Sequence, residues 1–194
     1  MTFIKISAII KITIAVWLID IQDLHCKNSE QVSGSVAANV ASATENLRDT
    51  TAVDPKKLFT KADADKIMGQ PTHLADSSSK VKAVISRYLC SYKADVKDSN
   101  TGKIGTIYFL FEQYRQISDA KKKYADIMQA NKSHGIEDIS DLGDEAYYHT
   151  DGTNFNFIMV RKGKNVFTIK VNITTSTTSP NEFKKTANRI AASI

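Results

Sequence analysis

Apolar and polar residues alternate with a period of two in several parts of the chain, and this pattern predicts β-strands. The clearest case is residues 166–173, where every second residue is apolar, so that one face of the strand should be buried. Four further segments are rich in aromatic and β-branched residues and also predict strands: 87–94, 104–111, 145–149 and 154–160. The first two of these are separated by turn-forming residues and should pair as a hairpin.

Apolar residues at helical spacing predict helices over 60–69 and 116–131. Thr60 is a favourable N-cap for the first helix, Asp63 occupies its third position, and Gly69 can end it in the left-handed conformation. The second helix is longer, and its apolar stripe should face the rest of the domain.

The C-terminal segment predicts a third helix. Ser179 is a favourable N-cap, Pro180 takes the first helical position and Glu182 completes a capping box. The predicted order is α-β-β-α-β-β-β-α. Strands that occur in hairpins separated by helices are typical of a two-layer α+β domain, with a mostly antiparallel sheet and helices packed on one face.

The N-terminal segment predicts an export signal over residues 1–25. Its apolar run, residues 12–19, lies between Lys11 and Asp20. A transmembrane helix needs about 20 predominantly apolar residues, so a run of this length indicates a signal-peptide core. An uncleaved or differently cleaved signal, and a buried helix, are the alternatives.

Cys26 follows this apolar run and precedes a polar stretch, an arrangement that resembles a bacterial lipoprotein signal. The resemblance implies that Cys26 becomes the lipidated first residue of the mature protein, although Asp23-Leu24-His25 departs from the usual small residues before such a cysteine. The chain has two cysteines, and a disulfide between Cys26 and Cys90 is the competing interpretation. Lipidation and the disulfide exclude each other.

Residues 26–55 have the composition of a flexible tether, rich in Ser, Ala, Thr, Asn and Gln and without an aromatic residue. The whole chain carries a formal charge of +5, but residues 56–194 hold 22 basic and 15 acidic side chains. The positive charge therefore belongs to the predicted domain, 56–194. Its basic clusters, 121–123 and 161–164, are short and mostly lysine, which favours a solvated or envelope-facing surface over nucleic acid as a partner.

Composition excludes several classes of protein. Hydrophobic residues make up 42% and charged residues 24%, so the chain is neither wholly disordered nor low in complexity. Two cysteines are too few for a disulfide-rich scaffold or a cysteine-rich zinc module. No phosphate-binding loop or nucleophile elbow occurs, and the sequence indicates no cofactor.

Several short segments occur in an order that resembles small bacterial extracytoplasmic lipoprotein domains, over about residues 56–175. These segments are Leu58-Phe59-Thr60 with the helix that follows, Cys90-Ser91-Tyr92, Leu142-Gly143-Asp144-Glu145-Ala146 and Arg161-Lys162-Gly163. The resemblance implies an α+β domain facing the periplasm or the cell exterior, with sensor or ligand-binding roles in some families. It transfers no catalytic residue.

Five carboxylates gather within residues 137–145, namely Glu137, Asp138, Asp141, Asp144 and Glu145. Their spacing is not that of an EF-hand, and the histidines lack metal-ligand spacing, so we expect a solvated loop and no metal site. We expect Gly143 to serve a left-handed or tightly packed backbone position. Convergence of Asp144, Glu145 and His149 in a pocket would instead indicate an envelope hydrolase.

The favoured hypothesis is a non-enzymatic, lipid-anchored envelope protein whose domain binds a small ligand or a partner protein. Exposed strand aromatics are the expected contacts, and Tyr88, Tyr92 and Tyr108 are the candidates. Ordinary packing within the sheet is the competing interpretation for each of them.

Overall fold

The computed structural model describes residues 53–194. The predicted signal peptide, Cys26 and residues 26–52 of the predicted tether lie outside this range. No helix in the described range is long and apolar enough to cross a bilayer. Val53 packs against the core and Pro55 begins the first helix, so ordered structure includes three residues that the sequence assigns to the tether.

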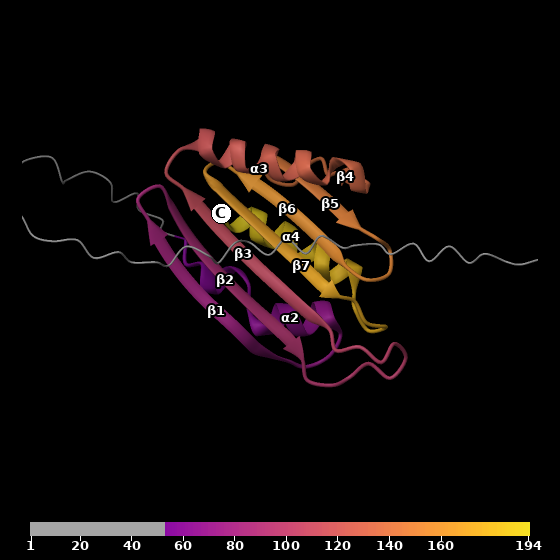
Figure 1. Ribbon diagram of the computed structural model, residues 1–194. Helices are drawn as coiled ribbons and strands as arrows, with labels where there is room; N and C mark the ends of the chain where they lie inside the picture. The colour runs from indigo at the N-terminus through magenta and orange to yellow at the C-terminus, as the bar shows by residue number, and fades with distance from the viewer. Residues whose placement is uncertain (1–52) are drawn as a thin grey trace, which may run out of the picture. The chain divides into compact units, whose positions relative to one another are not determined.

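A seven-stranded sheet forms the centre of the domain (Figure 1). Its strands are β1 (Thr72–Lys82), β2 (Ile85–Ala94), β3 (Thr106–Tyr114), β4 (Ile136–Asp138), β5 (Glu145–Thr150), β6 (Asn156–Lys162) and β7 (Asn165–Ile173). They lie in the order β1-β2-β3-β7-β6-β5-β4, and all neighbours are antiparallel. The predictions of an α+β fold, an antiparallel sheet and a β2–β3 hairpin are confirmed.

The helices are α1 (Pro55–Leu58), α2 (Lys61–Met68), α3 (Ile117–Asn131) and α4 (Pro180–Ser193), with a short 3-10 turn, η1 (Lys132–His134). Thr60 and Asp63 form the predicted capping box, and Gly69 ends α2 with φ 64°. Ser179 caps α4, but its backbone N–H donates to the carbonyl of Ile67. Glu182 instead pairs with Lys185, so the reciprocal half of the second predicted capping box is wrong.

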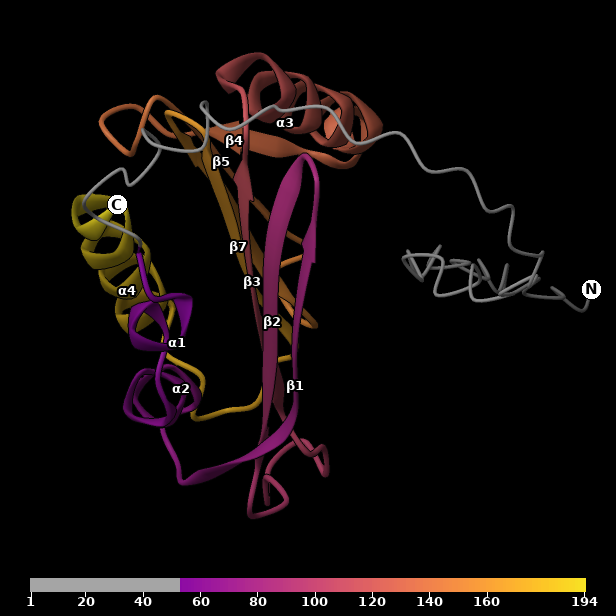
Figure 2. The ribbon, with the colours of Figure 1, turned by 90° about the vertical axis from the view of Figure 1, so that its left-hand side faces the viewer.

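The main core lies between one face of the sheet and three helices, α1, α2 and α4 (Figure 2). Even-numbered residues of β2 and odd-numbered residues of β3 and β7 point into it. Its largest fully buried side chains include Phe59, Ile67, Phe109, Phe167, Phe183 and Ile190. The predicted inward face of residues 166–173 is therefore correct, because Phe167, Ile169 and Val171 are all buried.

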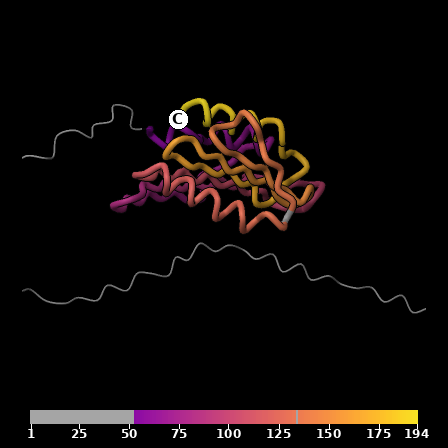
Figure 3. The backbone as a smooth tube through the Cα atoms, turned by 90° about the horizontal axis from the view of Figure 1, so that it is seen from above, coloured from indigo at the N-terminus to yellow at the C-terminus, as the bar shows by residue number. Residues whose placement is uncertain are grey.

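Helix α3 lies on the opposite face of the sheet (Figure 3). Its Ala120 and Tyr124 pack on Tyr147, Met159 and Val166, which form a second, smaller core. The expectation that every helix shares one face is thus wrong for α3. The physical reason is that β6 has apolar side chains on both of its faces, and each face needs cover.

Strands β1 and β4 and helix α1 were not expected from the sequence. Strand β1 is eleven residues long, but all of them after Thr72 are exposed. An edge strand with no buried face needs no alternation of apolar and polar residues. The sequence of β1 therefore shows no alternating pattern from which a strand could be predicted. Strand β4 is an edge strand of three residues, in which only Ile136 is partly buried, and it is too short to show an alternating pattern.

Candidate functional site

Strand register brings four side chains into one row across the α3 side of the sheet. Tyr108 of β3 lies opposite Lys170 of β7, Lys170 lies opposite Phe157 of β6, and Phe157 lies opposite His149 of β5. Because facing residues in a sheet project to the same side, these four side chains share a face. We call Tyr108, Lys170, Phe157 and His149 the cross-strand row.

The cross-strand row lies beside the area that α3 covers. The helix packs on Tyr147, Met159 and Val166, and these residues occupy neighbouring rows of the same face. Tyr108 keeps 38% of its surface exposed, while Lys170 and Phe157 are half-buried. The row is therefore an accessible strip of aromatic surface with a single cation in its middle.

Lys170 occupies an unusual environment for a charged side chain. Its Nζ atom lies 5.9 Å from the centre of the Phe155 ring, and that ring packs against the ring of His149. Burial lowers the pKa of Lys170, because desolvation disfavours the ammonium form. Within residues 53–194 no carboxylate forms an ion pair with Lys170, so only the aromatic ring partly compensates its charge.

The three tyrosines singled out from the sequence have different positions. Tyr88 and Tyr92 are 7% and 8% exposed and belong to the main core, where they pack near Phe59 and Phe109. The interpretation as ordinary sheet packing is correct for both. Tyr108 points to the other face and is the one that remains accessible.

Asp144, Glu145 and His149 do not converge. Arg161 binds both carboxylates, with 2.7 Å between its Nη1 atom and Oδ2 of Asp144, and its Nε atom donates to Glu145. His149 is four residues from Glu145 along β5, which places it about 13 Å away at the usual rise per strand residue. Both carboxylates of the hydrolase hypothesis are therefore bound to Arg161 and do not converge with His149.

The position of Arg161 also changes the interpretation of the basic cluster at 161–164. Its side chain is only 4% exposed, so it is not part of a solvated basic surface. The backbone N–H of Gly163 donates to Asp144 as well, and this hydrogen bond, together with Arg161, lowers the pKa of Asp144. The acidic loop is thus partly structural, and no group of three or more possible metal ligands occurs in the described part of the chain.

Gly143 has the expected role. Its φ is 68°, and a Cβ atom there would lie 2.6 Å from the carbonyl oxygen of Arg161. The adjacent backbone N–H of Asp144 donates to that same oxygen. Only glycine combines the left-handed conformation with this close approach.

Lys170 and Phe157 were not recognised as site residues from the sequence. Both were correctly placed on strands, and Lys170 was correctly placed on the outward side of its strand. The row depends on β7 lying between β3 and β6, and no local pattern encodes that strand order. Comparison of the chain with protein-family models, with curated proteins and with solved structures gave no significant match.

Proposed function

We propose that this protein is a non-enzymatic binding module of the bacterial cell envelope, and that the cross-strand row binds an acidic segment of a partner protein. The observation that carries the proposal is Lys170, a half-buried cation without a carboxylate partner in the described chain, flanked by Tyr108 and Phe157. An incoming carboxylate would supply the missing charge, and an apolar or aromatic side chain beside it would cover the rings.

The charges around the row support an anionic occupant. Glu112 and Glu145, each four residues along its strand from the row, are already paired with Arg87 and Arg161. Asp76 of β1 lies opposite Ser91, which lies opposite Tyr108, and it is exposed without an ion pair within residues 53–194. Lys93 lies on the same face of β2 and is exposed. A partner with negative charge would therefore be attracted to Lys170 and Lys93 and repelled by Asp76, so its acidic group should lie at Lys170, away from the β1 end of this face.

The length of the row favours a polypeptide over a small molecule. From Tyr108 to His149 it crosses β3, β7, β6 and β5, which is about 14 Å at the usual spacing between strands. An extended peptide of about four residues spans that distance. The row lies on an open sheet face, where a segment of that length can lie flat across the strands.

The proposal predicts a separation of binding from stability. Lys170→Met keeps the length of the side chain and removes an ammonium group whose burial is only partly compensated, so the variant should fold and be at least as stable as the original. It should nevertheless bind an acidic peptide at least about tenfold more weakly. If the charge of Lys170 lowers the stability of the domain but is needed for binding, its role is in binding and not in folding.

The probe is a fluorescein-labelled peptide of alternating Glu and Phe residues, measured by anisotropy with the full chain. A peptide with Lys in place of Glu is the charge control. Lys185→Met is the matched protein control, because Lys185 is 72% exposed on α4, on the other side of the sheet.

We expect the acidic peptide to bind and salt to weaken its binding. Lys170→Met and Tyr108→Ala should reduce the affinity for this peptide, while Lys185→Met should not. Equal binding of both peptides, no binding, or an unaffected Lys170→Met variant would overturn the proposal.

We further propose that residues 1–25 export the protein, that Cys26 carries a lipid, and that residues 26–55 tether the domain to the membrane. The motivating features are the short apolar run, the cysteine after it and the tether composition. The intact mass of the full chain expressed in bacteria tests this. A mature N-terminus at Cys26 with a lipid adduct, lost in Cys26→Ser, is expected. A Cys26–Cys90 disulfide or an unprocessed N-terminus would contradict it.

A further inference from the structure

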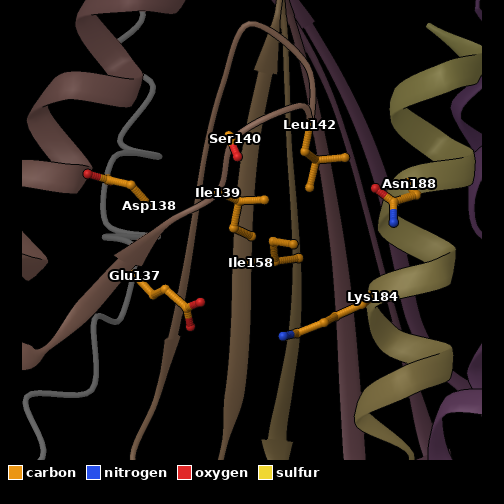
Figure 4. Close-up of a pocket in the computed structure, with 8 residues that line it drawn as sticks. All are labelled: Glu137, Asp138, Ile139, Ser140, Leu142, Ile158, Lys184 and Asn188. Carbon is orange, nitrogen blue, oxygen red and sulfur yellow. The ribbon is translucent and has the colours of Figure 1, made fainter.

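A recess beside α4 lies on the side of the sheet opposite to the cross-strand row. It is a pocket of about 230 Å³ between α4 and the segment that joins β4 to β5 (Figure 4). Ile139, Leu142 and Ile158 form its apolar floor. Pockets for drug-sized ligands run from about 300 to 1,000 Å³, so this one suits a smaller molecule.

Opposite charges face each other over this apolar floor. Lys184 extends from α4 and Glu137 extends from β4 toward the same space, whereas Asp138 points away from it (Figure 4). Glu137 and Lys184 do not form an ion pair with each other, and Lys184 Nζ lies 5.1 Å from the centre of the Tyr148 ring. Asn188, one turn along α4 from Lys184, adds an amide to the rim.

We infer that this pocket binds a small apolar zwitterion, such as a free amino acid with an aliphatic side chain. The carboxylate of the ligand would pair with Lys184 and accept a hydrogen bond from Asn188, its ammonium would pair with Glu137, and its side chain would lie on the apolar floor. A ligand with both charges would bridge two side chains that form no ion pair with each other. A ligand with one charge would leave the other side chain unpaired, which is the basis for discrimination.

L-Leucine is the probe, with calorimetric titration of the full chain as the readout. Two analogues each lack one charged group: 4-methylpentanoate has no ammonium and 3-methylbutylamine has no carboxylate. We expect leucine to bind and each analogue to bind at least about tenfold more weakly. Lys184→Met and Glu137→Gln should each weaken leucine binding, and both side chains are exposed, so neither change should prevent folding.

Two control variants make the result specific. Lys185→Met alters the residue next to Lys184 but not the pocket, and it should bind leucine normally. Lys170→Met alters the cross-strand row on the other face and should also bind leucine normally. No detectable leucine binding, equal binding of the analogues, or full binding by Glu137→Gln and Lys184→Met would overturn the inference, whatever the outcome at the cross-strand row.

Discussion

Arg87 and Glu112 face each other across β2 and β3, and the carboxylate of Glu112 is almost completely buried. Arg87 Nε lies 2.9 Å from Oε1 of Glu112, and the hydroxyl of Tyr114 donates to the other carboxylate oxygen at 3.1 Å. Glu112 is 1% exposed, whereas Arg87 is 33% exposed. The pair is therefore asymmetric, because the carboxylate depends on its partners and the guanidinium can still reach water.

Arg87→Met should destabilise the domain by about 3 kcal/mol, because it leaves Glu112 charged and buried with only Tyr114 as a partner. The double variant Arg87→Met/Glu112→Leu should recover most of that loss, since it replaces both charges with apolar groups. Urea unfolding of the two single variants and the double variant measures this coupling. Additive losses would show that the pair contributes nothing specific.

The sequence predicted the strands that have at least one buried face, including β6, which is covered on both, and missed β1, in which every residue after Thr72 is exposed. Residues 167–173 alternate because the main core covers one side of this part of β7, whereas Val166 packs on the other side in the second core. Strand β1 has no buried side, and its composition is that of a loop. A strand alternates between apolar and polar residues when one of its faces is buried and the other is exposed. A strand with no buried face therefore has no such pattern and cannot be predicted from it.

The position of α3 could have been inferred from β6. Phe157, Ile158, Met159 and Val160 are four consecutive apolar residues, which is typical of a strand covered on both faces.

The candidate site could not have been inferred from a local pattern of this kind. Tyr108 was named from the sequence, but its neighbours Lys170 and Phe157 reach it only through the pairing of β3 with β7 and of β7 with β6. Non-local strand order is set by the whole core, so no short segment predicts it.

Gly143→Ala should cost about 3 kcal/mol. The added Cβ atom would meet the carbonyl of Arg161 at 2.6 Å and Cγ1 of Val160 at 2.8 Å, in addition to the strain of a left-handed backbone at φ 68°. Gly152→Ala is the matched control, because Gly152 has φ 79° but nothing within 4 Å of its added Cβ. The control should cost about 1 kcal/mol, from the backbone alone. Equal shifts of the urea midpoint would mean that the close approach at Gly143 relaxes freely.

Cys90 should react with thiol reagents only when the domain unfolds. It is fully buried in the main core, and burial raises its pKa to about 11, so that little thiolate forms at neutral pH. In a Cys26→Ser chain Cys90 is the sole thiol, and its alkylation by iodoacetamide can be followed by mass. We expect protection in buffer and full labelling in concentrated urea. Rapid labelling of the folded chain would show that β2 opens locally.

Asp98 should supply part of the resistance of the domain to acid. Its carboxylate accepts hydrogen bonds from the backbone N–H of Ser176, of Asn100 at 2.7 Å and of Thr101 at 3.1 Å, and thereby joins the β2–β3 loop to the segment before α4. These bonds, first that from Ser176, hold the pKa of Asp98 far below its usual range. A carboxyl group whose pKa is lower in the folded state stabilises the fold above its unfolded value, about 3.9, and that contribution is lost as the pH falls toward the folded value.

Asp98→Asn should therefore lower the midpoint of thermal unfolding at neutral pH and flatten its decline below about pH 4. The amide has no charge to lose, and with one carboxylate oxygen replaced by an NH₂ group, it cannot accept the hydrogen bonds of Ser176, Asn100 and Thr101 as the carboxylate does.

Asp126→Asn is the control, because Asp126 is 62% exposed and pairs only with Lys122 on the outer side of α3. Thermal unfolding across acidic pH should separate the two variants. Some acid dependence should remain in Asp98→Asn, since hydrogen bonds also lower the pKa of Asp151 to about 2 against the effect of burial. Parallel pH curves for Asp98→Asn and the original chain would contradict the assignment of acid resistance to this junction.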